Sequence, residues 1–161
     1  MTSSNIIDIN YAQTGQSTQT NSMGMREMQA KVYAAREEQY LLVKAPPASG
    51  KSRALKFVAL DKLVNNGIKK VVVAVPEKTI GRSFQNTDLK KFGFFEDWRV
   101  AQYFNLCDTE NERDKIGRFK EFFSQKNQDK LVCTHATLRA AMKEMENGIF
   151  NDCLLAIDEF H

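Results

Sequence analysis

The apolar residues of this chain recur with two periods, one typical of strands and the other typical of helices. Short apolar runs predict strands at residues 40–44, 71–75, 99–104, 131–134 and 154–157. Spacings of three and four residues between apolar positions predict helices at residues 25–39, 51–65, 111–124 and 137–146. Because strands and helices alternate, we expect an α/β fold with a mainly parallel sheet flanked by helices.

The N-terminal segment lacks either period. Residues 1–22 are rich in Ser, Thr, Asn and Gln, so we expect a flexible polar arm there. Residues 23–161 then form one folded domain, and a chain of 161 residues is long enough to bury a sizeable core. Within this domain V-V-V-A-V, residues 71–75, is the clearest strand, because uniformly apolar, β-branched runs are typical of strands covered on both faces.

Composition excludes several functional classes. No apolar run approaches the roughly eighteen residues of a membrane span, and the polar N-terminus lacks the layout of a secretory signal. We therefore expect a cytoplasmic protein with no membrane partner. The three cysteines, Cys107, Cys133 and Cys153, are widely spaced, which indicates reduced thiols rather than a disulfide framework or a zinc site. The net charge of +3 permits a polyanionic partner without arguing for one.

The stretch A-P-P-A-S-G-K-S, residues 45–52, lies between a predicted strand and a predicted helix. A strand that turns tightly into a helix directs backbone N–H groups and the positive end of the helix dipole at one small volume, which suits phosphates. Gly50 permits close approach of the backbone, Lys51 offers an ammonium to the outer phosphates, and Ser52 offers a hydroxyl to Mg²⁺. Ala45 replaces the first glycine of G-x-x-x-x-G-K-[ST], and a small residue suffices there unless φ is positive. Alone, the stretch fits an ordinary strand-to-helix turn equally well.

Two adjacent carboxylates end the last predicted strand. Asp158 and Glu159 follow L-L-A-I directly, and carboxylates at the end of an apolar strand are costly unless they have partners. At the carboxyl end of a parallel strand, Asp158 could hold Mg²⁺ and Glu159 could orient and deprotonate a water. The alternative is that both residues simply begin a loop. Together with the lysine loop, they favour a nucleotide site.

Four stretches resemble, in this order, the helicase motifs I, Ia, Ic and II. They are A-P-P-A-S-G-K-S (45–52), V-V-V-A-V-P-E-K-T-I-G-R-S-F-Q (71–85), T-H-A-T-L (134–138) and L-L-A-I-D-E-F-H (154–161). The chain is therefore similar, over residues 25–161, to the superfamily-2 DEAD/DEAH-type helicases and translocases, and among them to the helicase subunits of restriction-type enzymes. D-E-F-H differs from D-E-A-D and D-E-A-H in its third and fourth letters. Motifs I and II are the specific part of the resemblance, whereas Ia and Ic are loose patterns.

The resemblance implies a P-loop (Walker A) NTPase domain of RecA-like fold that hydrolyses ATP with Mg²⁺. Its catalytic residues would be Lys51, Asp158 and Glu159, with the metal held by Ser52 and Asp158. Gln29, in G-M-R-E-M-Q, stands where the family has an adenine-reading glutamine, although it could also be a solvated helix residue. The residues implied to contact the cofactor are Arg26, Gln29, Pro47, Ala48, Ser49, Gly50, Lys51 and Ser52.

Motifs Ia and Ic contact the nucleic-acid backbone in the family. The matching residues are Pro76, Lys78, Gly81, Arg82, Gln85, Thr134, His135 and Thr137. Hydroxyls, amides and a few cations in loops at strand ends suit phosphate contacts that carry no base code. Ordinary loop and helix-cap chemistry explains each of these residues equally well, since Thr and Ser commonly cap helices.

The family pattern extends beyond the last residue of this chain, with a further strand carrying an S-A-T-like motif and a second RecA-like domain. We therefore expect a sheet that is incomplete at its C-terminal edge and weak turnover by this chain alone, because facing arginines from a second domain accelerate phosphoryl transfer. The leading interpretation is the ATP-binding motor domain of a helicase or translocase acting on DNA rather than RNA. The alternatives are a P-loop ATPase acting on a target other than nucleic acid, and a truncated module that binds nucleic acid or a partner protein without turnover.

Overall fold

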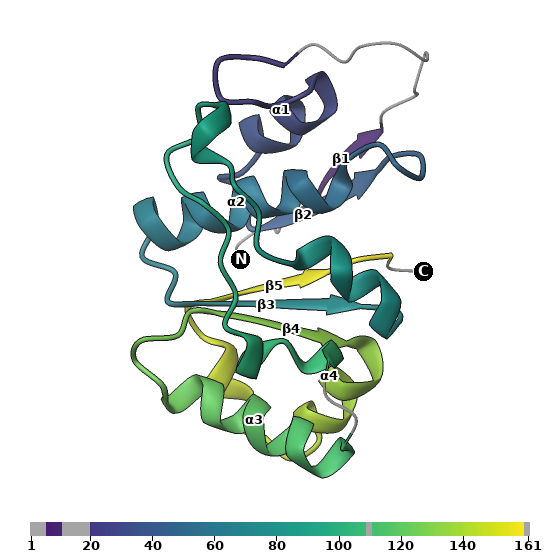
Figure 1. The fold of residues 1–161 in the computed structure, drawn as a ribbon, viewed down its shortest axis with the longest axis vertical. Coiled ribbons are helices and arrows are strands. Elements are labelled where there is room, and N and C mark those ends of the chain that lie inside the picture. Colours follow the sequence, from purple (N-terminus) through teal and green to yellow (C-terminus); the bar gives the residue numbers. More distant parts are fainter. Residues whose placement is uncertain (1–5, 11–19, 109–110, 160–161) are drawn as a thin grey trace. The chain divides into compact units, whose positions relative to one another are not determined.

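The computed structural model describes residues 6–10, 20–108 and 111–159. The helices and strands are β1 (Ile6–Asn10), α1 (Glu27–Ala34), β2 (Tyr40–Lys44), α2 (Lys51–Asn65), β3 (Lys70–Val75), α3 (Glu112–Ser124), β4 (Lys130–Thr134), α4 (His135–Met142) and β5 (Cys153–Ile157). Short 3-10 helices connect several of them, among them η1 (Lys78–Phe84) and η3 (Gln102–Phe104). This alternation confirms the predicted α/β class (Figure 1).

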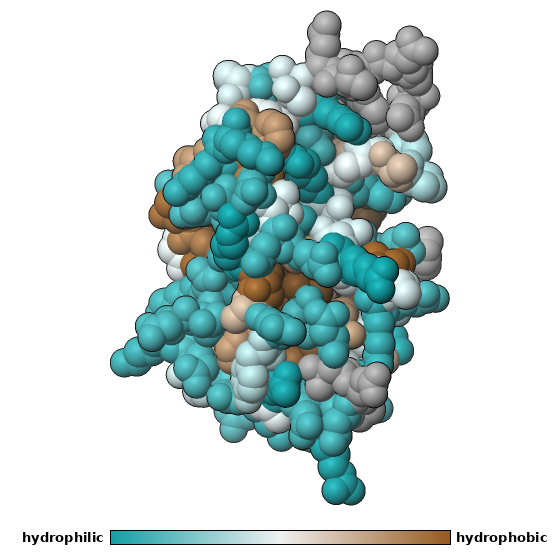
Figure 2. Space-filling model, viewed as in Figure 1, coloured by the Kyte–Doolittle hydropathy of each residue, from teal (hydrophilic) through white to brown (hydrophobic). Residues whose placement is uncertain are grey.

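The chain forms two compact units, which are described separately. Unit 1 consists of Met1–Val58 and Asp88–Asp97, and unit 2 consists of Ala59–Thr87 and Trp98–His161. Helix α2 begins in the first unit and ends in the second. None of the helices in the described ranges is long and apolar enough to cross a membrane. The face drawn in Figure 2 is mostly hydrophilic, and its hydrophobic residues gather in small patches.

Unit 2 is built on a parallel three-stranded sheet of order β4-β3-β5 (Figure 1). The central strand is fully buried along most of its length, as its uniformly apolar sequence predicts. Helices α3 and α4 contribute to the core on the side of Val72 and Ala74, where Phe119, Phe122 and Leu138 pack together. The flanked parallel sheet is that of a partial RecA-like domain and places the carboxyl ends of three strands at one edge.

Unit 1 contains a parallel pair of strands, β1 and β2, with Ile9 opposite Val43. Helices α1 and α2 pack against this pair through Met28, Val32 and Ala54. Residues 88–97 complete the unit. Their Phe94 ring meets the rings of Tyr33 and Phe57 edge-on, with centroid separations of 5.9 and 4.7 Å. These ring contacts pack residues 88–97 against α1 and α2, the second of which follows the phosphate loop.

Two segments differ from the sequence predictions. Part of the predicted flexible arm, residues 1–22, forms strand β1 in the structure, whereas residues 1–5 and 11–19 lie outside the described range. The physical reason is the β-branched sequence I-I-D-I-N, which suits a strand once β2 offers an edge. The expected strand at residues 99–104 is wrong. Its second half is η3, followed by a turn in which the Asn105 side chain accepts the Cys107 N–H at 3.3 Å.

The sheet prediction can be compared with the strand pairing in the described residues. All paired strands are parallel, as expected, but they belong to a two-stranded and a three-stranded sheet. The predicted helix bounds are confirmed for α2 and approximately for α3. Helix α1 ends at Ala34, five residues before the predicted end at residue 39. Helix α4 ends at Met142, four residues before the predicted end at residue 146.

Candidate nucleotide and nucleic-acid sites

The phosphate loop leaves β2 at Lys44 and enters α2 at Lys51. Its backbone turns sharply, since Ala48 and Gly50 have φ values of 59° and 90° and the Ser49 N–H donates to Pro46 O at 3.3 Å. Glycine relieves this left-handed strain at position 50, whereas Ala48 bears it. Ala45 has no positive φ. The alanine at the first motif position is therefore tolerated, as the sequence predicts.

Lys51 and Ser52 open helix α2, and both are half-buried. The Lys51 ammonium donates to Ala45 O across the loop at 3.0 Å. The first N–H groups of a helix have no partner within it, so the start of α2 directs partial positive charge toward the loop. The predicted phosphate-binding lysine is thus tied across the loop to a backbone carbonyl.

Ser49 and Gly50 supply the most direct test of whether the loop fits a phosphate chain. The Ser49 side chain is 7% exposed, and its Oγ is the one buried side-chain polar atom in the described residues without a hydrogen-bond partner. A Cβ added at Gly50 would lie 2.5 Å from Gln29 Nε2, so only glycine fits there. An unsatisfied buried hydroxyl beside a lysine and a helix N-terminus suits phosphate oxygens. The residues present therefore fit ATP.

Gln29 is not the solvated helix residue of the alternative interpretation. Its side chain is 2% exposed, its Oε1 accepts the Arg26 N–H at 2.9 Å, and its Nε2 donates to Gly50 O at 3.2 Å. The glutamine therefore joins the start of α1 to the phosphate loop, while the Arg26 side chain is exposed. One amide hydrogen and one lone pair of Gln29 remain for a base, so adenine recognition stays a prediction.

The carboxylates lie in unit 2, directly after β5. The Asp158 N–H donates to Ala74 O at 2.8 Å, which extends the pairing of β5 with β3 by one residue. Asp158 is half-buried, whereas Glu159 is exposed and left-handed, with a φ of 51°. No group of three or more metal-ligating side chains occurs in the described part of the chain. Carboxylate oxygens such as those of Asp158 are among the ligands that suit Mg²⁺, which also keeps water and phosphate ligands.

A long-range contact joins this carboxylate segment to the T-H-A-T stretch. His135, the first residue of α4, has its Nε2 2.8 Å from Asp158 O. Thr134 caps the same helix, since its Oγ1 accepts the Thr137 N–H at 3.2 Å and lies 3.1 Å from the Thr137 hydroxyl. The structure thus brings together two motifs that are separated by more than twenty residues in the sequence.

The comparisons with known proteins agree with this geometry. The model of the DEAD/DEAH box helicase family matches residues 26–161. The chain belongs to the DEAD/DEAH box helicase family. It is also 57% identical over 157 residues to the "Putative ATP-dependent helicase YeeB" of Bacillus subtilis (strain 168), with 98% of this chain and 26% of that protein covered. The chain thus spans about a quarter of the length of this relative. No solved structure gives a significant match.

In this helicase-family domain the residues predicted to contact nucleic acid fall into two groups. Lys78, Arg82 and Gln85 are exposed on and after η1, and Pro76 is half-buried. Gly81 is buried instead, and an added Cβ would lie 2.8 Å from both Cβ and Sγ of Cys107. Thr137 is likewise only 2% exposed, with its hydroxyl against that of Thr134. Packing and helix capping account for the last two residues.

The aromatic contacts of Arg53, two residues after Lys51, are not predicted by the sequence. Its guanidinium lies over the rings of Phe57 and Phe92, at 5.9 and 5.2 Å from their centroids. Burial and the nearby charge of Arg26 lower the pKa of Arg53. The sequence shows a cation directly after G-K-S, but no sequence pattern links it to Phe92, which lies in a distant segment.

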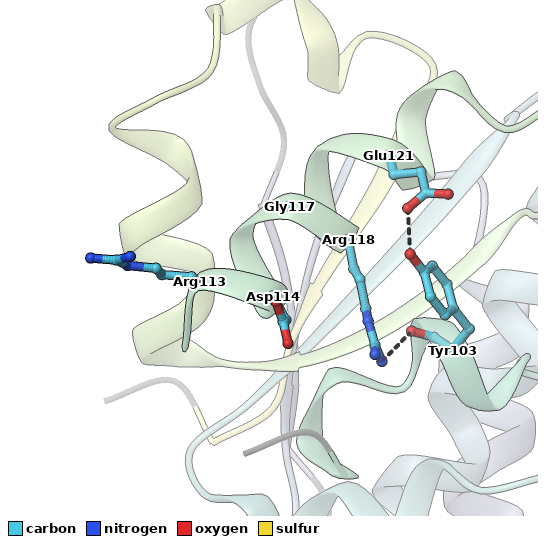
Figure 3. A pocket seen from close by; sticks show the side chains of 6 residues that line it. All are labelled: Tyr103, Arg113, Asp114, Gly117, Arg118 and Glu121. Carbon is cyan, nitrogen blue, oxygen red and sulfur yellow. Dashed lines mark hydrogen bonds between the residues drawn. The ribbon is translucent and has the colours of Figure 1, made fainter. Parts of the chain in front are cut away.

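A hollow in unit 2 is lined by residues of η3 and α3. Tyr103, Arg118 and Glu121 form its polar wall, together with Arg113, Asp114 and Gly117 (Figure 3). The Tyr103 hydroxyl donates to Glu121 at 2.5 Å, which raises the pKa of Tyr103, and the Arg118 guanidinium stacks 4.3 Å from the Tyr103 ring centroid. Tyr103, Arg118 and Glu121 therefore bond to one another across this wall.

Proposed function

We propose that this chain is the ATP-binding motor domain of a nucleic-acid-dependent ATPase, a helicase or translocase that uses ATP to move along or unwind DNA. The observation that carries the proposal is the phosphate loop, with its unsatisfied Ser49 hydroxyl and the lysine of G-K-S bonded across it to Ala45 O. Family membership over residues 26–161 supports the same function.

The roles proposed for individual residues follow from their chemistry. Lys51 neutralises the outer phosphates, and the Ser49 hydroxyl and the loop N–H groups donate to phosphate oxygens. Ser52 and Asp158 are the protein ligands of Mg²⁺, which neutralises developing charge on the phosphates when it is bound. Glu159 accepts the proton of the attacking water. Gln29 hydrogen-bonds the adenine base, and Arg26 lies near the same base.

We propose that nucleic acid binds at the loops after β3 and β4, through Pro76, Lys78, Arg82, Gln85 and the T-H-A-T stretch. Contacts from Lys78 and Arg82 to phosphates predict binding that weakens with salt. DNA is the substrate proposed here, on the resemblance to helicase subunits of restriction-type enzymes. A second RecA-like domain is the proposed partner for efficient turnover, and we propose that the chain by itself hydrolyses ATP slowly.

Nucleotide binding by this chain tests the first part of the proposal. Titration calorimetry with ATP and Mg²⁺ should show binding that Lys51→Ala weakens about 10- to 100-fold, because a charged hydrogen bond contributes about 1.5–3 kcal/mol. Lys62→Ala, which removes a lysine from the same helix, is the matched control and should bind within about twofold of wild type. Absence of binding by the wild-type chain, or equal affinity of Lys51→Ala, would overturn the proposal.

The dependence of ATP hydrolysis on nucleic acid separates the proposed function from its alternatives. We expect single-stranded or duplex DNA to stimulate ATP hydrolysis and RNA to stimulate it less, with Lys51→Ala abolishing the activity. Stimulation by RNA but not by DNA would show that the substrate is RNA instead of DNA. An ATPase indifferent to both nucleic acids would indicate another target, and nucleic-acid binding that survives with no hydrolysis in the wild type would indicate a binding module.

A further inference from the structure

His135 crosses the end of the three-stranded sheet in unit 2. Strands β4 and β5 pair with opposite edges of β3, with Val75 opposite Thr134 and Ala74 opposite Ile157. Two outer strands of a sheet are roughly 10 Å apart, so their backbones do not touch. The His135 ring bridges this gap from the residue after β4 to the residue after β5, and places Nε2 2.8 Å from Asp158 O.

The direction of this hydrogen bond follows from its acceptor. A carbonyl oxygen can only accept, so Nε2 of His135 carries the hydrogen and donates it. The Asp158 backbone is then held on both sides of its Cα, by its N–H donating to Ala74 O at 2.8 Å and by His135 donating to its carbonyl. The backbone of the following residue, Glu159, is in the left-handed region with a φ of 51°. This conformation costs about 1 kcal/mol or more for a residue other than glycine. Fixed neighbours are needed to hold it there.

The other end of this connection is the T-H-A-T stretch. His135 begins α4, and the Thr134 cap ties its backbone to Thr137. A shift of this helix start would move the ring and release or reposition the Asp158 carbonyl. In the described residues the His135 side chain therefore links the two segments, whereas the hydroxyls of Thr134 and Thr137 lie against each other.

We propose that His135 is a positioning residue that couples the T-H-A-T stretch to the Asp158–Glu159 segment, so that nucleic acid bound at the first changes the affinity of the second for Mg²⁺ and nucleotide. This inference rests on the proposed function, because that function assigns nucleic acid to one segment and metal to the other. The coupling is reciprocal, so bound nucleotide changes nucleic-acid affinity by the same factor.

The first test measures the hydrogen bond without any ligand. In the whole chain, His135→Phe keeps a planar ring but removes the donor, whereas His135→Gln keeps an N–H donor on a side chain of comparable reach. We expect the Asp158 amide to exchange with deuterium about tenfold faster in His135→Phe, and near the wild-type rate in His135→Gln. Val73, at the centre of the sheet, should exchange at the wild-type rate in both variants, which separates a local effect from unfolding. Equal Asp158 exchange in wild type and His135→Phe would overturn the proposal.

The second test measures the coupling itself. The affinity for ATP with Mg²⁺ is determined with and without a saturating single-stranded DNA oligonucleotide. We expect a ratio of about fivefold or more in wild type, His135→Gln and the control Lys143→Gln, and a ratio near one in His135→Phe. A wild-type ratio of one, or an unchanged ratio in His135→Phe, would refute the coupling. A wild-type chain that binds no ATP would instead refute the proposed function, and the exchange measurement would still decide whether His135 positions Asp158.

Discussion

At the scale of single residues, the phosphate loop contains two buried polar side chains in opposite states. The side-chain oxygen of Gln29 accepts the Arg26 N–H, and its amide nitrogen donates to Gly50 O. The Ser49 hydroxyl, in contrast, has no hydrogen-bond partner among the described residues. Buried polar groups in proteins are nearly always paired, and an unpaired one calls for an explanation. Here the satisfied residue holds the loop in shape, and the unsatisfied residue is available to a ligand.

Replacement of Ser49 should therefore change stability and binding in opposite directions. Ser49→Ala removes a buried hydroxyl without a partner, so the free energy of unfolding should rise by about 1 kcal/mol. The affinity for ATP should fall about fivefold, because one neutral hydrogen bond contributes about 1 kcal/mol. Urea unfolding and calorimetry measure the two effects, with the exposed Ser83→Ala as the control. A loss of stability in Ser49→Ala would show that the hydroxyl has a partner in the free protein.

Lys56 predicts a pH dependence of stability. Its side chain is 4% exposed, and burial together with the charge of Arg53 lowers its pKa from 10.5 to about 8. Between these two values the unfolded chain binds the proton and the folded chain does not, so this lysine makes stability rise with pH. Relative to Lys56→Met, wild type should gain up to about 3 kcal/mol from pH 8 to pH 10.5.

Thermal or urea unfolding of both proteins across this pH range measures the difference. Lys62→Met controls for the loss of a lysine from α2. A wild-type minus Lys56→Met difference that stays constant, or falls with pH, would contradict the assignment.

Local structure around a motif is predictable from sequence. The loop at residues 45–50 lies between β2 and α2 as expected, because the loop, the strand before it and the helix after it are contiguous, while the roles of Gly50 and Lys51 stay predictions. The bond from His135 to Asp158 O was not predicted, since it depends on how β4 and β5 flank β3. Burial of Thr137 was missed for the same reason, because the sequence shows a hydroxyl without showing what covers it.

At the scale of elements, the local pattern predicts both ends of β2 and of α2. Helix α1 stops earlier than its helix-forming sequence suggests. Arg36 turns back, stacks 4.2 Å from the Tyr33 ring centroid and donates to Tyr33 O at 3.1 Å, which satisfies a carbonyl at the helix end. Strand β1 was missed because it is short and has no partner near it in sequence. Both errors are cases in which tertiary contacts outweigh propensity.

The cap of α4 gives a prediction at this scale. Thr134→Ala removes the oxygen that accepts the Thr137 N–H, and should lower the free energy of unfolding by about 1 kcal/mol. Thr134→Ser keeps the acceptor and should restore most of the loss. Chemical denaturation with intrinsic fluorescence of Trp98 provides the measurement. Equal destabilisation by both variants would indicate that the Thr134 methyl group, rather than its cap, is what matters.

At the scale of the whole molecule, the described three-stranded sheet ends at β5. Leu155 and Ile157 lie on one face of this strand and are 37% and 39% exposed. Exposed apolar residues on an edge strand promote pairing with other chains. We expect the 161-residue chain to self-associate with rising concentration in sedimentation velocity, and Leu155→Lys/Ile157→Lys to shift it toward monomer.

The control for this experiment is Val64→Lys, which changes a residue that is 56% exposed but lies on α2. It should leave the association unchanged. A wild-type chain that stays monomeric at every concentration, or a Val64→Lys variant that dissociates as readily as the β5 variant, would refute the assignment of the association to β5.

The path of the chain through its two units also bears on how the protein is made. The chain leaves unit 2 at Thr87, contributes Asp88–Asp97 to unit 1 and returns at Trp98. Thr87 and Trp98 close this excursion with reciprocal backbone bonds of 2.9 and 3.0 Å. A nascent chain therefore cannot complete unit 1 when its first 58 residues leave the ribosome. The phosphate loop must wait for Phe94 to reach Tyr33 and Phe57, so the two units mature during overlapping intervals of translation instead of one after the other.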